Sequence, residues 1–338
     1  MKRKYRIAIF IAIILLSLFV YELFFSPNYF EGDRFIIVSR GETFEDVIDS
    51  LVSAGVISNR FYIEAAGRIL GWTTLMQVGK YRFKSGISNY QILDNLRHGK
   101  TIETIMVTIP EGYRTTTIAK IFAQKLGIDS SRFMKFVNDS IFARKLGVEA
   151  GNLNGYLMPK SYEFYWQTDE ENIITTMVNE FWKDVDSSML TQAKMRGKSI
   201  HEIVTLASII ELETAIDSER TIISGVYYNR LKRKMRLQAD PTVQYALGGE
   251  PRRLKFSDLK IESPYNTYIN YGLPPGPINN PGLASIKAAL FPAKHRYLYF
   301  VATGEGGHRF SLTFDEHGKA KKKYIQIREQ QKKLMDQQ

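Results

Sequence analysis

A strongly apolar segment that carries two carboxylates, residues 203–214, restricts the fold more than any other feature of the sequence. On a helical wheel at about 100° per residue, apolar side chains occupy almost the whole circumference, and Glu211 and Glu213 are set among them. A helix that is apolar nearly all round belongs in a protein interior. A carboxylate on such a helix must be paired, hydrogen-bonded or protonated.

Two interpretations of these carboxylates follow from the pattern. In the first, Glu211 or Glu213 forms a structural ion pair with Arg220 or Arg230. In the second, one carboxyl stays protonated at neutral pH, as a general acid requires. The two glutamates lie about 200° apart around the helix, so they cannot form the facing carboxyl pair of a glycoside hydrolase. One of them acts alone or with a carboxylate from elsewhere.

The charge of the chain is concentrated at its two ends. The net charge is +11, of which residues 1–6 contribute +4 and residues 319–338 contribute +5. The body between them is almost neutral, which argues against a nucleic-acid-binding protein. The length of 338 residues allows two or three domains. The absence of cysteine excludes disulfides and thiolate chemistry.

No metal or other cofactor is expected from the histidines. His201 and Glu202 resemble half of a zinc-protease motif, but Thr205 stands where the second histidine would be. The remaining histidines are scattered without the spacing of metal ligands.

The N-terminal segment predicts a membrane anchor. Residues 7–25 are apolar except for Ser17 and Glu22, which gives a length at the short end for a membrane span. Four basic residues precede this segment, so we expect a cytoplasmic N-terminus and a body outside the inner membrane, in the periplasm. A cleavable signal peptide is the alternative. No small-x-small cleavage site follows the run, which favours a single-pass anchor.

The rest of the chain predicts an α+β fold. Residues 33–109 read as a small α/β module, in which Ser88 caps a helix that Gly99 ends. Residues 110–318 form a second, mixed α+β domain, and residues 319–338 form a basic helix. Helical periodicity in the second domain is expected over residues 115–126, 131–138, 142–146 and 173–193.

Several sequence blocks together resemble one family, the endolytic murein transglycosylases of the YceG-like, or MltG, family. They occur in the order of the family and span nearly the whole chain. The blocks are LASIIELET at 206–214, SER at 218–220, YYNRL at 227–231, MRLQADPTVQYALG at 235–248, SPYNTY at 263–268, GLPPGPINNPG at 272–282 and YLYFVATGEGGHRF at 297–310.

This resemblance implies an activity and a catalytic residue. Such an enzyme cleaves the MurNAc–GlcNAc bonds of peptidoglycan within the glycan strand and leaves 1,6-anhydroMurNAc ends. In the family, the second glutamate of the ExET block is the catalytic residue. It corresponds to Glu213 in this sequence, and Glu211 is the alternative. The resemblance also implies a LysM-like subdomain at 33–109 that contacts glycan or spaces the catalytic domain from the membrane. Nascent strands and penicillin-binding synthases are the implied partners.

Three blocks supply candidate substrate-binding residues. Asp240 is either a second acid facing Glu213 or the N-cap of a helix over 242–247. Tyr156 either contacts sugar or fills a core. In the same block, Asn154, Lys160 and Ser161 differ from the polar residues that the family usually has at these positions. His308, in an expected hairpin, is a further candidate for substrate contact. The substrate-binding candidates are Gln238, Asp240, Thr242, Tyr265, Asn266, Thr267 and Tyr156.

Two other functions remain open at this level. A hydrolytic muramidase would use Asp240 as a second carboxylate and consume water. A non-catalytic scaffold would bind the cell wall without cleaving it.

Overall fold

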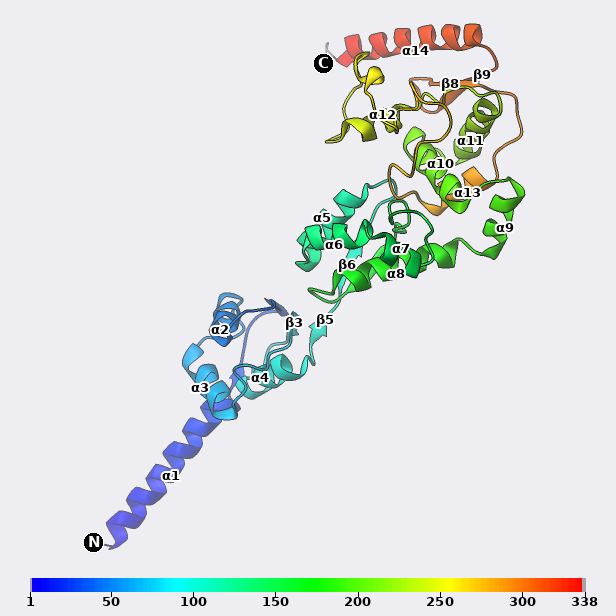
Figure 1. Ribbon diagram of the computed structural model, residues 1–338. Helices are drawn as coiled ribbons and strands as arrows, with labels where there is room; N and C mark the ends of the chain where they lie inside the picture. The colour runs from blue at the N-terminus through cyan, green and yellow to red at the C-terminus, as the bar shows by residue number, and fades with distance from the viewer. Residues whose placement is uncertain (1, 336–338) are drawn as a thin grey trace. The chain divides into compact units, whose positions relative to one another are not determined.

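The computed structural model describes residues 2–335 and divides into two compact units. The first unit contains the chain up to Val107 together with Phe122–Ile128 and Tyr162–Asp169. The second contains Thr108–Ile121, Asp129–Ser161 and the chain from Glu170 onward. The fold is mixed α+β with an N-terminal apolar helix, as the sequence predicts (Figure 1).

The first helix, α1 (Lys2–Phe24), is long and apolar enough to cross a membrane. Its residues from Arg3 to Phe24 have a mean hydropathy of 2.7 over the most apolar window, and almost all of that window is exposed. These properties fit a membrane anchor, and they fit a signal sequence equally well. Met1 of the expected basic segment 1–6 lies outside the described residues.

A three-stranded antiparallel sheet forms the first unit together with three further helices. Strand β3 (Gly79–Phe83) is central and pairs with β2 (Arg34–Val38) and β5 (Ile102–Glu103). The helices are α2 (Phe44–Ser53), α3 (Arg60–Leu70) and α4 (Asn89–His98), and a separate pair of short strands is β1 (Pro27–Asn28) and β4 (Ile87–Ser88). The expected caps of α4 are confirmed, because the Ser88 side chain accepts from the backbone N–H of Gln91 and Gly99 ends the helix at a φ of 65°.

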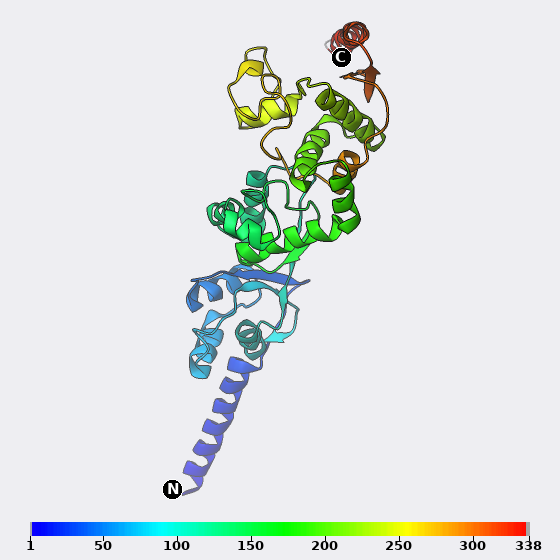
Figure 2. The same cartoon turned by 45° about the vertical axis from the view of Figure 1, so that its right-hand side comes forward.

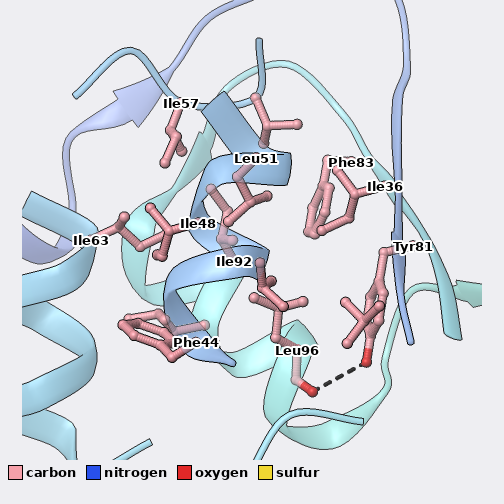
Figure 3. Close-up of a cluster of buried hydrophobic side chains, with 14 of the residues drawn as sticks. Ile36, Phe44, Ile48, Leu51, Ile57, Ile63, Tyr81, Phe83, Ile92 and Leu96 are labelled. Carbon is pink, nitrogen blue, oxygen red and sulfur yellow. Dashed lines mark hydrogen bonds between the residues drawn. The ribbon is translucent and has the colours of Figure 1, made fainter. Parts of the chain in front are cut away.

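The core of this unit lies between the sheet and its helices (Figure 3). Buried side chains alternate with exposed ones in β2 and with half-buried ones in β3, and they meet side chains from α2, α3 and α4. Tyr81 is fully buried in this core, and its hydroxyl donates to the carbonyl of Leu96 at 3.1 Å and to that of Gln77 at 2.7 Å. The buried phenol is therefore satisfied.

The second unit is mainly helical and carries one β-hairpin. Three elements, α5 (Thr115–Leu126), β6 (Ile105–Thr108) and β7 (Ser161–Phe164), have residues assigned to both units. The helices of the second unit are α6 (Ser130–Val137), α7 (Ser140–Lys145), α8 (Glu170–Asp184), α9 (Ser187–Met195), α10 (Ile200–Glu213), α11 (Asp217–Lys232), α12 (Asp240–Leu247), α13 (Leu283–Leu290) and α14 (Phe314–Met335), with a 3₁₀ turn at Asp258–Lys260.

The single helix expected over residues 173–193 is wrong. The structure has two helices there, α8 and α9, with a break at Val185 and Asp186. The carboxylate of Asp186 accepts from the backbone N–H groups of Ser188 and Met189, which caps a new helix. Such side-chain acceptors favour a helix start over a helix interior.

The C-terminal part joins a hairpin to a long helix. Strands β8 (Tyr299–Ala302) and β9 (His308–Ser311) pair antiparallel, with Ala302 opposite His308. Helix α14, red in the figures, lies beside this hairpin in both views (Figures 1 and 2). It begins earlier than the expected residue 319. Residues 336–338 of the expected segment lie outside the described residues.

Helix α10 is the buried element that its composition predicts. Every residue from Ile203 to Ile210 is buried, and the helix packs against α11 and α13. A capping box fixes its start, because the Ser199 hydroxyl accepts from the backbone N–H of Glu202 and the Glu202 carboxylate accepts from that of Ser199.

Candidate active site

Glu213 is the last residue of α10, at the point where the buried helix reaches open space. The helix ends there because Thr214 adopts an extended conformation, with φ −149° and ψ 140°. Glu213 lines two neighbouring cavities of the second unit, one of about 770 Å³ and one of about 380 Å³. Asp240, the first residue of α12, lines both cavities as well.

The surroundings of Glu213 raise its pKa from an ordinary 4.5 to about 7. Burial of the carboxyl group is the largest cause of this rise, and the negative charge of Asp240 contributes to it. Two groups oppose this rise: the Tyr227 hydroxyl, which donates to Oε1 at 2.5 Å, and the positive charge of Arg230. Among residues 3–331, whose side chains the structure describes, no lysine or arginine forms an ion pair with Glu213. The group therefore titrates near neutrality.

Glu211 has the structural role that the ion-pair interpretation described. Its Oε1 accepts from Arg220 Nη1 at 2.9 Å, and its Oε2 accepts from the backbone N–H of Gly282 at 2.8 Å. Both side chains of the ion pair are less than a tenth exposed. Through these contacts the carboxylate holds α10, α11 and the start of α13 together. The ion-pair interpretation thus applies to Glu211, and Glu213 remains the candidate for the general acid.

Asp240 is not the N-cap of α12. The cap position belongs to Ala239, which makes no side-chain hydrogen bond, and Asp240 opens the first turn. Its exposed carboxylate accepts from the Tyr268 hydroxyl at 2.5 Å. This bond directs the carboxylate toward the cavities that it shares with Glu213.

Three of the substrate-binding candidates lie beneath the cavity wall and offer no surface to a ligand. Thr242, Asn266 and Thr267 are buried. The hydroxyl groups of Thr242 and Thr267 bond to each other at 2.9 Å, and the Asn266 amide donates to the carbonyl groups of Leu259 and Ile261. The structure therefore gives these residues a framework role instead of the expected sugar contact.

Tyr156 is also a core residue and does not contact either cavity. It is 1% exposed, packs edge-on against Phe181 at 4.9 Å between ring centroids, and stacks on His201. Its hydroxyl hydrogen-bonds to His201 Nδ1 at 3.2 Å. The aromatic ring fills space between α8 and α10, so the core alternative holds for this residue.

Besides Asp240, the candidates Gln238 and Tyr265 remain accessible. Gln238 is exposed, lines the smaller cavity, and has a left-handed φ of 52° that turns the chain there. Its side-chain oxygen accepts from Arg230 at 3.3 Å. Tyr265 is half-buried and contacts Tyr245 with ring centroids 4.7 Å apart, and Tyr245 lines the larger cavity.

Three residues of the site were missed from the sequence: Tyr227, Tyr268 and Glu219. Tyr227 and Tyr268 each donate to one of the two carboxylates, and Glu219 binds His308 at the edge of the smaller cavity. The sequence feature that could have identified the two tyrosines is their place in the family blocks, since Tyr227 belongs to YYNRL and Tyr268 ends SPYNTY. Nothing in the pattern distinguished these tyrosines from ordinary core aromatics.

Comparison with known proteins gives a consistent family assignment. The model of the YceG-like family matches residues 36–323. An endolytic murein transglycosylase of Bacillus subtilis (strain 168) is 38% identical over 264 residues, which are 74% of this chain and 73% of the relative. Its counterpart in Streptococcus pneumoniae (strain D39) is 29% identical over 311 residues, or 83% of this chain, which spans 56% of that relative's length.

A solved structure agrees with the sequence comparisons. A YceG-like protein from Listeria monocytogenes superimposes with a TM-score of 0.62 at 33% identity, covering 85% of this chain and 98% of that one. The family model covers the residues that build the cavities around Glu213. The chain belongs to the YceG-like family.

Proposed function

We propose that this protein is an endolytic murein transglycosylase that cleaves MurNAc–GlcNAc bonds of peptidoglycan, with Glu213 as acid and then as base. One observation carries the proposal: Glu213 has a pKa near 7, no ionic partner among residues 3–331, and a place where two cavities meet. The names of the relatives from Bacillus and Streptococcus agree with this activity.

The reaction needs only one carboxyl group. Protonated Glu213 gives its proton to the glycosidic oxygen as the bond from the MurNAc anomeric carbon breaks. The carboxylate then takes the proton of the MurNAc 6-hydroxyl, whose oxygen attacks the same anomeric carbon. The product has a 1,6-anhydro ring, no water is consumed, and Glu213 regains its proton. Acid–base help of this kind contributes about 10²–10⁴ in rate.

The two cavities suit cleavage within a strand. Because Glu213 and Asp240 line both of them, a glycan can lie across the acid with sugars on either side. The larger cavity offers the Tyr245 ring and the Arg114 side chain, which lies over that ring at 5.4 Å. The smaller cavity offers the amide of Gln238. An aromatic ring and an amide suit the apolar face and the polar groups of an N-acetyl sugar.

The second candidate function is a hydrolytic muramidase. The observation that favours it is the position of Asp240, whose carboxylate shares both cavities with Glu213. Asp240 could activate a water molecule, and the product would then be a reducing end. Asp240→Asn separates the two candidates, because a transglycosylase keeps forming anhydro product whereas a muramidase loses its base.

The remaining parts of the chain support a role at the membrane. We propose that α1 anchors the protein in the inner membrane with its N-terminus in the cytoplasm, and that residues 110–318 are the catalytic domain. Residues 33–109 act as a LysM-like subdomain, supported by a cavity of about 570 Å³ lined with polar groups that include Arg82, Gln91 and Asn95. Nascent glycan strands are the substrate, and penicillin-binding synthases are the proposed neighbours.

Mass spectrometry of digested sacculi tests the activity. The full-length protein in detergent should release muropeptides with anhydro ends, each lighter by one water than the reducing product. Glu213→Gln should abolish this release. A control, Glu45→Gln, changes an exposed carboxylate of α2 that pairs only weakly with Arg68, at 3.6 Å, and should behave as wild type. Anhydro release by Glu213→Gln at the wild-type rate would refute the proposal, and no release by the wild type would favour a non-catalytic scaffold.

A further inference from the structure

His308 is held in one orientation by a carboxylate from another helix. Glu219, in the first turn of α11, accepts two hydrogen bonds from this residue: one from its backbone N–H at 2.7 Å and one from ring Nδ1, also at 2.7 Å. The Thr214 hydroxyl donates to the same carboxylate at 3.1 Å. Since Thr214 follows Glu213 directly, one carboxylate ties the ring of His308 to the residue next to the proposed acid.

The local backbone is shaped for this contact. Gly307 has a φ of 77°, in the left-handed region that favours glycine. A Cβ atom at this position would lie 2.7 Å from Oε1 of Glu219, so another residue there would displace the carboxylate from its present place. The two side chains of the pair are about one-sixth exposed or less. The contact is therefore built into the fold and is not a chance meeting of surface groups.

Only one polar atom of the ring remains available. A carboxylate can only accept, so Nδ1 carries a proton and, in the neutral ring, Nε2 is an acceptor. Phe300 packs edge-on against the ring at 5.5 Å between centroids. None of the hydrogen bonds among residues 3–331 uses Nε2. The ring lines the smaller cavity, together with Glu213, Asp240 and Gln238.

We propose that His308 is a substrate-contacting residue. Glu219 orients its ring so that Nε2 accepts a hydrogen bond from a sugar hydroxyl or acetamido N–H in the smaller cavity. Glu219 is then a positioning residue that acts through His308. The inference rests on the proposed function, and it adds a specific contact on the side of Glu213 that faces β8, β9 and α14. The contact helps to fix the sugar whose bond Glu213 protonates.

Two substitutions separate this role from simple anchoring of the hairpin. His308→Asn keeps a side-chain donor near the position of Nδ1 but removes the acceptor at Nε2. His308→Gln reaches the position of Nε2 with an amide oxygen. We expect His308→Asn to lower kcat/KM roughly three- to tenfold, the loss of one ordinary hydrogen bond. We expect His308→Gln to recover most of that loss, with both variants retaining the wild-type melting temperature.

A matched control lies in the first unit. His98 also directs Nδ1 at a carboxylate, Asp94, at 2.8 Å, but it is remote in sequence and lines neither cavity. His98→Asn should leave kcat/KM unchanged. The inference is overturned if His308→Asn matches the wild type, or if His308→Gln is no better than His308→Asn. Glu213→Gln is measured in parallel. If Glu213→Gln is fully active, the proposed function is refuted. If Glu213→Gln is inactive and His308→Asn is as active as the wild type, only the role of His308 is refuted.

Discussion

Replacing Glu213 by glutamine should stabilise the protein, and the gain should depend on pH. The amide has nearly the same size as the carboxyl group, and its oxygen can still accept from the Tyr227 hydroxyl. What the substitution removes is the cost of ionising a buried acid. The folded wild type holds its proton up to a pH of about 7, whereas an unfolded chain releases it near 4.5. Between these values the folded state binds more protons, so the free energy of unfolding of the wild type falls as the pH rises.

The size of this effect follows from the interval between the two pKa values. Each pH unit within it removes about 1.4 kcal/mol of stability from the wild type. An interval from 4.5 to about 7 sets an upper limit of about 3 kcal/mol. Solvent in the cavities screens the half-buried carboxylate, so a value of about 1–3 kcal/mol is expected. Below pH 4.5 both states are protonated and the substitution should have little effect of this origin.

Urea unfolding of the full-length wild type and Glu213→Gln in the same detergent measures this difference. We expect the difference in unfolding free energy to grow from pH 4.5 to pH 7 and then to level off. Glu45→Gln should show no such growth, because its carboxylate is exposed. A difference between wild type and Glu213→Gln that stays constant from pH 4.5 to pH 8 would refute the reasoning, since it would mean that Glu213 ionises as freely in the fold as in the unfolded chain.

Two further predictions concern the neighbours of Glu213. Tyr227→Phe removes a hydrogen-bond donor that lowers the pKa of Glu213, so that pKa should rise. In a pH–rate profile, the alkaline fall in kcat/KM should therefore move to higher pH. A fall at the same or a lower pH would contradict this role of the hydrogen bond. Glu211→Ala removes the buried carboxylate that pairs with Arg220, which keeps the exposed Asp217 as its ionic partner, and should cost about 3–5 kcal/mol in the free energy of unfolding. Its activity per folded molecule should remain, measured at low temperature with the folded fraction known; complete loss of activity in folded Glu211→Ala would point to Glu211 as the acid.

The fold could be predicted from the sequence wherever local pattern decides it. The apolar run of α1, the capped helix α4 and the buried helix α10 all follow from periodicity and from single capping residues. The break between α8 and α9 was not anticipated, because the apolar spacing continues across it. The side chain of Asp186 accepts from the amides of Ser188 and Met189, and this cap begins the second helix.

The candidate site was predictable in part for a related reason. The sequence shows which residues are chemically able to act, and it placed Glu213, Gln238 and Asp240 among them. It could not show that Tyr156 is enclosed by Phe181 and His201, because an aromatic residue looks the same in a core and in a groove. That difference depends on residues distant in the chain.

The sequence by itself determined the presence of a buried helix with two carboxylates, because the hydrophobic effect acts on apolar residues wherever they recur at helical spacing. Only the tertiary structure decided which carboxylate has an ionic partner. Arg220 and the backbone of Gly282 converge on Glu211, while Glu213 receives one phenolic hydroxyl and a cavity, and its burial raises its pKa. A pKa is set by the groups that the fold brings within a few ångströms, and that distance is not recorded in the order of residues along the chain.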